Sequence, residues 1–111
     1  MTVYRTYKGG RLDLQHYKGK SIVNYEFTVT CPEGLVYFDD YVQIELRMFQ
    51  KLHGTSVFTT LLDVSSPADV LLWNQDKESM DLLQKPYYHE CVGVYASGEE
   101  DILFHGVSLI L

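Results

Sequence analysis

Histidine and cysteine are the side chains of this sequence that could bind a metal or act in catalysis. No pair of its four histidines has the close spacing that a zinc site uses. His89 and Cys91 share one face of a predicted strand, and His105 could lie across a hairpin from them. A metal site or a Cys–His dyad there is conceivable, but nothing nearby suggests an oxyanion hole or an orienting carboxylate. Cross-strand partners at the edge of a core are the preferred interpretation, so we expect no metal, no cofactor and no enzyme activity.

Two runs of carboxylates and one pair of glycines are further candidate sites. Asp39–Asp40 and Glu99–Asp101 are consecutive acids, whereas a calcium loop interleaves its acids with other residues. Solvated turns, or rim contacts to a basic partner, are the expected roles. Gly9-Gly10 is flanked by basic residues like a phosphate loop, but no predicted helix follows it, so a hairpin turn is expected.

Aromatic residues make up 14% of the chain, with nine tyrosines, which is typical of both β-sheets and binding surfaces. They cannot all be core residues, and the outward ones are covered by this chain, by a partner subunit or by a sugar. The candidate interface residues are Tyr37, Tyr41, Phe49, Trp73, Tyr87 and Tyr95.

The elements that must position these side chains are strands. In Ser21–Cys31 every second residue from Val23 to Cys31 is predicted to face inward, and Tyr41–Phe49 is predicted to turn Val42, Ile44, Leu46 and Met48 inward. The remaining expected elements are strands at Val3–Tyr7, Arg11–Gln15, Leu35–Phe38, Ser56–Leu62 and Asp69–Trp73, a helical turn from the N-cap Asp76 to Leu83, and a closing hairpin of Tyr87–Tyr95 and Ile102–Leu111 around Gly98.

About seven to nine strands and one short helical turn, separated by regularly spaced turn signals, predict an all-β fold. We expect a single domain over residues 1–111, built as an antiparallel β-sandwich or barrel.

The net charge of −6 and the scattered basic residues argue against nucleic-acid binding. No signal peptide and no membrane-spanning stretch are evident. Cys31 and Cys91 are expected to be free thiols, with a disulfide between strands as the alternative.

The order of these elements resembles the small immunoglobulin-like β-sandwich modules of tailed-phage virions, such as the N-terminal domain of baseplate upper proteins and related neck or tail adaptors. The resemblance lies in the alternating strand after Lys18–Ser21, the central strand Tyr41–Phe49 and the helical segment Asp76–Leu83. It continues in the strand led by Pro86–Tyr88 and in the final run Glu99–Val107, with its mid-strand glycine.

This resemblance implies an immunoglobulin-like sandwich that serves as a structural subunit of a phage particle, assembled in the host cytoplasm. Its partners would be other virion subunits and itself, in an oligomer, with no nucleic acid, membrane or small-molecule ligand. Exposed strand edges and aromatic patches would make the contacts. The alternatives are a carbohydrate-binding module with Trp73 as its platform, and a small inhibitor of a host defence protein.

Overall fold

The computed structural model describes residues 3–17, 20–51, 54, 56–65, 69–76 and 87–110. These residues form eleven strands and one short 3₁₀ helix, η1 (Phe38–Asp40). The strands are β1 (Val3–Tyr7), β2 (Gly10–Arg11), β3 (Leu14–His16), β4 (Ile22–Cys31), β5 (Gly34–Leu35), β6 (Gln43–Phe49), β7 (Ser56–Leu61), β8 (Asp63–Val64), β9 (Leu71–Gln75), β10 (Tyr87–Val94) and β11 (Glu100–Ile110). The helix expected up to Leu83 lies outside the described residues.

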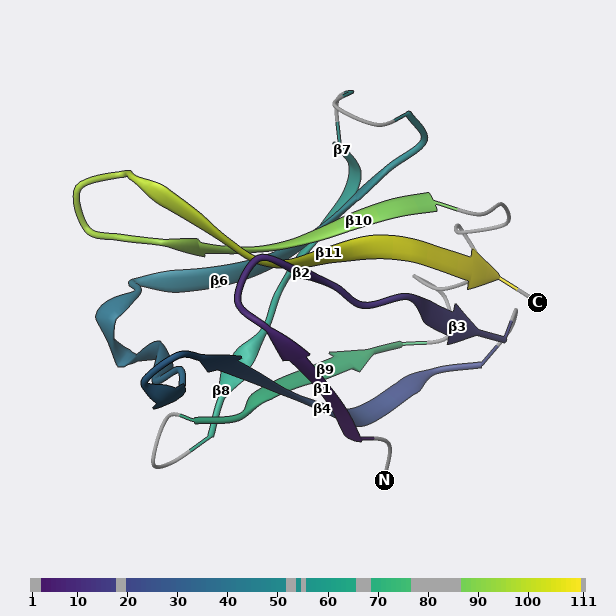
Figure 1. Cartoon of the computed structure of the whole chain (residues 1–111). Coiled ribbons are helices and arrows are strands. Elements are labelled where there is room, and N and C mark those ends of the chain that lie inside the picture. The colour runs from purple at the N-terminus through teal and green to yellow at the C-terminus, as the bar shows by residue number, and fades with distance from the viewer. Residues whose placement is uncertain are drawn as a thin grey trace.

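Two sheets pack face to face, so the prediction of an all-β sandwich is confirmed (Figure 1). Sheet A has the order β1-β4-β9-β8, with β5 also paired to β4. Sheet B has the order β2-β11-β10-β6-β7, with β3 also paired to β11.

The sheets are mixed, which corrects the expectation of purely antiparallel pairing. β1 runs parallel to β4, and both β2 and β3 run parallel to β11. The cause lies at Gly9-Gly10, which does not close a hairpin but carries the chain from sheet A to sheet B. Lys8 N–H donates to the Thr30 carbonyl of β4 at 2.8 Å, and Gly9 N–H donates to the Leu103 carbonyl of β11 at 2.9 Å.

A second crossing joins the sheets on the other side. β7 ends in sheet B and β8 begins in sheet A, and Figure 1 shows the chain passing from one to the other. Leu62 lies between them and is buried, and its N–H donates to the Ile44 carbonyl of β6 at 2.9 Å. Both sides of the sandwich are therefore spanned by a strand that changes sheets.

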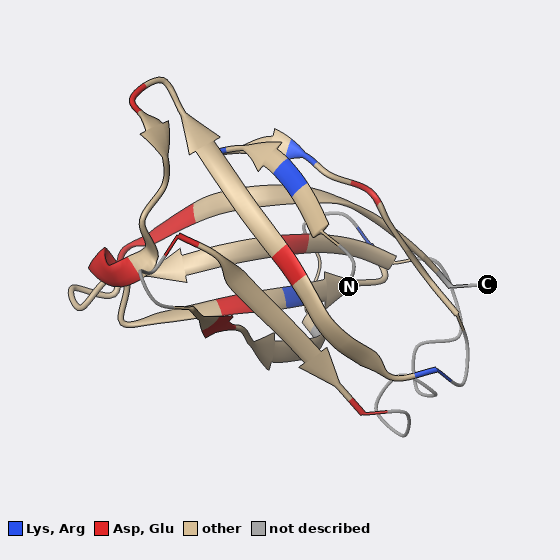
Figure 2. Cartoon of the chain, turned by 90° about the horizontal axis from the view of Figure 1, so that it is seen from below, with Lys and Arg blue, Asp and Glu red and all other residues tan. Residues whose placement is uncertain are grey.

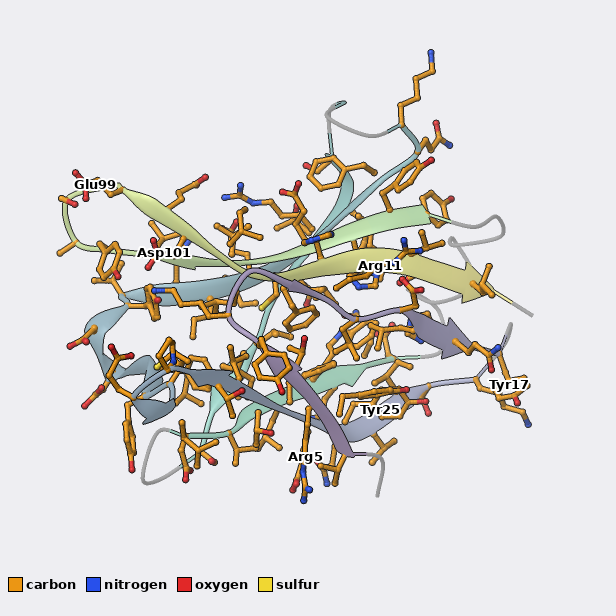
Figure 3. All side chains as sticks on the ribbon, in the orientation of Figure 1. Arg5, Arg11, Tyr17, Tyr25, Glu99 and Asp101 are labelled. Atoms are coloured by element: carbon orange, nitrogen blue, oxygen red, sulfur yellow. The ribbon has the colours of Figure 1, made fainter. Side chains whose placement is uncertain are left out.

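The core lies between the sheets and is dominated by large side chains (Figure 3). Phe27 of β4 stacks on Phe104 of β11 with ring centroids 5.2 Å apart, which joins the two layers. Trp73 of β9 is 0% exposed and meets the ring of His16 edge-on at 5.2 Å. Cys91 is buried and Cys31 half-buried, and both are free thiols, as expected.

The alternation predicted for β4 is correct from Phe27 onward and wrong at its start. Ile22 is 3% exposed, whereas Val23 is 61% exposed. The register against β9 shifts between Ile22 and Tyr25, and Asn24 sits there with a φ of +49°. A bulge adds one residue to a strand, so it reverses the faces of the residues that precede it.

The central strand follows its predicted alternation with one exception. Ile44, Leu46 and Met48 are all buried, as expected. Val42 is 64% exposed, because it precedes β6 and lies outside the ladder. The strand expected at Leu35–Phe38 is also shorter than predicted, since Phe38 begins η1 instead.

The closing hairpin is confirmed. β10 and β11 pair antiparallel along their length, with a register shift between Cys91 and Val92. Gly98 has a φ of +90°, which favours glycine, and its N–H donates to the Tyr95 carbonyl at 2.9 Å.

Candidate functional site

The outer face of sheet B is divided into a polar end and an apolar end. At the polar end Arg47 of β6 donates to Glu45 through Nε at 2.8 Å and to Glu100 of β11 through Nη2 at 2.7 Å. The pKa of the Glu100 carboxyl is lowered, first by its hydrogen bond to Arg47. These side chains satisfy one another, so this end has little left to offer a ligand.

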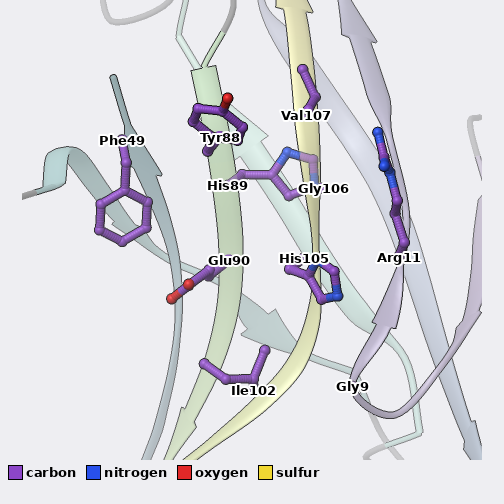
Figure 4. Close-up of a pocket in the computed structure, with 10 residues that line it drawn as sticks. All are labelled: Gly9, Arg11, Phe49, Tyr88, His89, Glu90, Ile102, His105, Gly106 and Val107. Atoms are coloured by element: carbon purple, nitrogen blue, oxygen red, sulfur yellow. The ribbon is translucent and has the colours of Figure 1, made fainter. Parts of the chain in front are cut away.

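The apolar end is hollowed, with a cavity of about 760 Å³, which we call the outer-face hollow (Figure 4). Phe49 of β6 and Tyr88 of β10 lie on one side of it, and Ile102 and Val107 of β11 supply further apolar surface. Ile102 and Tyr88 are each 39% exposed. The rest of the lining is Gly9, Arg11, His89, Glu90, His105 and Gly106.

Strand alternation explains why these residues face outward. Along β10, Tyr87 and His89 are buried, so Tyr88 and Glu90 between them point to the other face. Val92 pairs with Glu45, which faces outward, yet it is 0% exposed. It belongs to the outer face by register and is covered there by its neighbours.

A chain of buried hydrogen bonds lies beside the hollow. His89 Nε2 is 2.7 Å from the Leu12 carbonyl, and a carbonyl only accepts, so Nε2 carries the proton. Burial lowers the pKa of His89 to about 4, and the neutral ring therefore accepts at Nδ1 from the Ser108 hydroxyl at 2.8 Å. Ser108 in turn accepts from His16 Nε2–H at 3.3 Å.

This row of hydrogen bonds leaves one acceptor, Nδ1 of His16, without a donor among the described residues. Burial also lowers the pKa of His16 to about 4, so that ring is neutral and its Nδ1 carries a lone pair. Nδ1 is buried and has no hydrogen-bond partner among the described residues. Neutral, buried histidines with their ring orientation set by a hydroxyl and a carbonyl are structural groups.

A serine between two histidines resembles the arrangement that activates a nucleophile in some enzymes. The burial of Ser108 excludes that role for this serine. Ser108 is 0% exposed, so no substrate can reach its hydroxyl. The far nitrogen of His89 faces a backbone carbonyl rather than a carboxylate. The chain of hydrogen bonds therefore fastens β3, β10 and β11 together.

The trio considered for metal binding is not brought together. His89 and Cys91 are buried on the inner side of β10, where His89 only borders the hollow, whereas His105 is exposed and faces into it. No group of three potential metal ligands occurs among the described residues. Burial raises the pKa of the Cys91 thiol, so this group is not a nucleophile either.

Two of the predicted interface tyrosines belong to a cluster at the end of the closing hairpin. Tyr41 and Tyr95 pack with ring centroids 4.8 Å apart, and their hydroxyls donate to the same Asp101 oxygen at 2.9 and 2.6 Å. Lys8 reaches that oxygen at 3.3 Å. The tyrosine hydroxyl of Tyr95, above all, lowers the pKa of Asp101. These rings hold the hairpin against the body.

The other predicted interface residues divide into exposed and buried ones. Tyr37 is 54% exposed, and half-buried Phe49 lines the outer-face hollow. Trp73 and Tyr87 are 0% and 6% exposed, so the expectation that they form part of a surface is wrong. They are core residues because β9 and β10 each turn them toward the opposite sheet.

The hollow itself was missed by the sequence analysis, apart from Phe49. One signal was present: in Tyr87–Cys91 the apolar and histidine side chains alternate, so Tyr88 and Glu90 belong to the other face. Arg11 could not be found in this way, because β2 joins the rim only through the crossing at Gly9-Gly10.

The distribution of charged residues and the lengths of the helices add little to the definition of a site. Figure 2 shows acidic residues spread over strands and turns, with the basic residues dispersed among them. None of the described helices is long and apolar enough to cross a membrane.

The sequence was compared with family models and with curated proteins, and it matches none of them.

Proposed function

We propose that this chain is a binding subunit that acts through protein–protein contacts, and that it serves as a structural subunit of a tailed-phage particle. The outer-face hollow carries the first part of this proposal. It places Phe49, Tyr88, Ile102 and Val107 together on the outward side of a sheet, where a monomer has no reason to gather them.

The partner that suits this hollow is a polypeptide segment. Tyr and Phe supply apolar contact area in the centre of a contact, and Arg11, Glu90 and His105 can hydrogen-bond to a backbone at its rim. The buried Ser108–His89 pair offers no chemistry, which favours binding over catalysis. The phage setting rests on the resemblance of the predicted order of elements to that of virion sandwich modules.

The test is incorporation into particles made from the genome that encodes this chain. We expect mass spectrometry of purified particles to find the chain at a fixed ratio to the other subunits. Tyr88→Ser should reduce incorporation about 30-fold or more, since loss of a central anchor costs about 2 kcal/mol or more of binding. Tyr7→Ser is the matched control, because Tyr7 is 75% exposed on the outer face of sheet A. Particles that lack the wild-type chain would contradict the phage setting.

A carbohydrate-binding module is the second candidate, and one observation favours it. Phe49 and Tyr88 stand beside Glu90 and His105, and sugar sites combine aromatic platforms with polar groups. Trp73 has no part in this version, because it is fully buried. A glycan array decides: a hit that Phe49→Ala abolishes would support it, and no response would remove it. Co-purification with one host protein instead would point to an inhibitor that uses the same hollow.

A further inference from the structure

A second hollow lies on the outer face of sheet A, and its cavity measures about 520 Å³. We call it the sheet-A hollow. Sites for small molecules are commonly cavities of about 300–1,000 Å³. The lining residues are Arg5, Thr6, Tyr7, Thr28, Thr30 and Leu35. None of them lines the outer-face hollow, which belongs to the other sheet.

The register of the strands explains why the surface is low here. Arg5 of β1 is the partner of Thr28 of β4, and Tyr7 is the partner of Thr30. Leu35 of β5 flanks Thr30 on its other side. All five residues alternate with inward-facing ones, so they lie on the outer face. Two short threonine side chains therefore form a floor between longer side chains.

The guanidinium of Arg5 is an unpaired charge at this hollow. Arg5 is exposed, and Figure 3 shows its side chain projecting from β1 away from sheet B. The ion pairs among the described residues use Lys8, Arg11 and Arg47, and none of them includes Arg5. The planar guanidinium is therefore free to give two parallel hydrogen bonds to a carboxylate or a phosphate.

The charges around Arg5 favour a ligand with a single negative charge. Glu26 of β4 lies on the same face, opposite Val3 and two residues along β1 from Arg5. The whole chain also has a net charge of −6. A doubly charged phosphate or a polyanion is repelled by this field and gains only one arginine in return. A carboxylate suits the hollow better.

The floor of the hollow offers hydroxyl groups. Thr30 Oγ1 donates to the Thr6 carbonyl at 3.3 Å, so its oxygen can still accept a hydrogen bond. The Thr28 hydroxyl has no hydrogen-bond partner among the described residues, so it can both donate and accept. These groups suit a ligand that itself carries hydroxyls.

The walls of the hollow add apolar surface. Tyr7 is 75% exposed, and Leu35, on the other side of Thr30, is 43% exposed. A tyrosine ring has an apolar face on which the C–H groups of a sugar ring can pack, and a hydroxyl that still reaches water.

We propose that the sheet-A hollow binds a sugar that carries a carboxylate. Arg5 pairs with the carboxylate, Thr28 and Thr30 hydrogen-bond to the sugar hydroxyls, and the Tyr7 ring covers an apolar face. A peptide carboxylate lacks the hydroxyls, and a neutral sugar leaves Arg5 unpaired. This site is independent of the outer-face hollow, and it adds a small-molecule ligand that the resemblance to virion modules does not imply.

The test is NMR titration of the isotope-labelled whole chain with four acidic sugars. The probes are the methyl glycosides of glucuronic, galacturonic, mannuronic and N-acetylneuraminic acid, each compared with its methyl ester. The ester removes the charge and keeps the rest of the sugar. We expect at least one acid to bind with a Kd of about 1 mM, and its ester to bind about tenfold more weakly or less. The amide signals of Arg5, Tyr7, Thr28 and Thr30 should shift most.

Variants then test the role of the guanidinium. Arg5→Gln should weaken binding of the acid about tenfold and leave binding of the ester nearly unchanged. Arg5→Lys keeps the charge without the planar fork and should give an intermediate affinity. Lys20→Gln is the matched control, because it removes the same charge from an exposed position at the other end of β4 from Thr28. Tyr7→Ser should weaken binding of acid and ester alike, without changing incorporation into particles.

The wild-type titration decides the matter even if a variant fails to fold. The proposal is wrong if none of the four acids shifts an amide signal at concentrations up to about 20 mM. It is also wrong if an ester binds as tightly as its acid, because Arg5 then has no part in recognition. Shifts that gather at Tyr88 and His105 instead would place the sugar in the outer-face hollow.

Discussion

At the scale of single residues, the hydrogen-bond chain from His16 through Ser108 to His89 is the most constrained part of the molecule. It ends on a backbone carbonyl, so only one arrangement of protons satisfies it. Both imidazoles must be neutral. Burying a charged imidazole costs free energy, and none of the groups that His16 and His89 hydrogen-bond to is a carboxylate that would offset this cost.

The free energy of unfolding should therefore depend on pH. Both histidines have folded pKa values of about 4, lowered mainly by burial, against about 6.5 when unfolded. The unfolded chain binds protons more readily, so stability is fully present above pH 6.5 and is lost as the pH falls toward 4. Each histidine contributes up to about 3 kcal/mol of this loss.

Urea unfolding followed by Trp73 fluorescence at several pH values measures this effect. His89→Gln should flatten the dependence. His105→Gln, at an exposed position, should change it far less, because the charge of His105 is the smallest of the influences on the pKa of His89. The carboxylates with lowered pKa values, Asp13 and Asp101 among them, act at lower pH, since their contribution disappears only as the pH falls through those values. Equal stability at about pH 7 and about pH 5 would contradict the assignment.

Gly93 illustrates a second constraint on a single residue. A Cβ at this position would lie 2.6 Å from two ring carbons of Tyr41, so the ring would have to move away from Asp101. We expect Gly93→Ala to lower the free energy of unfolding by about 2 kcal/mol. In a Tyr41→Ala background the same change should cost less than about 1 kcal/mol, because the clash is gone. Equal costs in both backgrounds, measured by urea unfolding, would show that the strain lies elsewhere.

At the scale of elements, the bulge in β4 depends on Asn24. Its φ of +49° is tolerated by asparagine and glycine but not by β-branched residues. Asn24→Val should therefore destabilise the protein by about 1–2 kcal/mol, whereas Asn24→Gly should be nearly neutral. Both variants keep the Asn24 N–H bond to the Asn74 side chain. Thermal unfolding compares them, and a valine variant as stable as the glycine one would argue against the bulge.

The same bulge limits how well the sequence predicts which residues of a strand face inward. Strict alternation identified the inward faces of β6 and of β4 beyond Tyr25, because burial of one face imposes a period of two. It failed at Val23 because one extra residue reverses the period and leaves no mark in the composition. It failed at Val42 because nothing local distinguishes a residue in a ladder from one just before it.

The candidate site was less predictable, and the reason is topological. The outer-face hollow joins residues of β2, β6, β10 and β11, which meet only when the sheet order is known. Trp73 is the opposite case, a residue predicted for a site that turned out to be buried. A lone tryptophan in a strand suits a sugar platform and a core equally well, and only the packing of the second sheet on it shows that it is a core residue.

At the scale of the whole molecule, the two crossings make one core shared by both sheets. We expect a single cooperative unfolding transition, with the loss of sheet measured by circular dichroism coinciding with the exposure of Trp73. Fluorescence that changes at a different denaturant concentration from the dichroism would show that the sheets unfold separately.

The parallel pairing of β2 and β3 with β11 also determines the order of events in time. Asp13 and Val107, which meet there, are 94 residues apart, so these strands can pair only after the chain has been synthesised beyond Val107. Contacts so distant in sequence must overcome loop-closure entropy before they contribute stability, and folds rich in them form in milliseconds to seconds rather than microseconds. During translation the segment from Gly10 to His16 therefore waits without its partner strand, and the buried histidines are among the last groups to leave water.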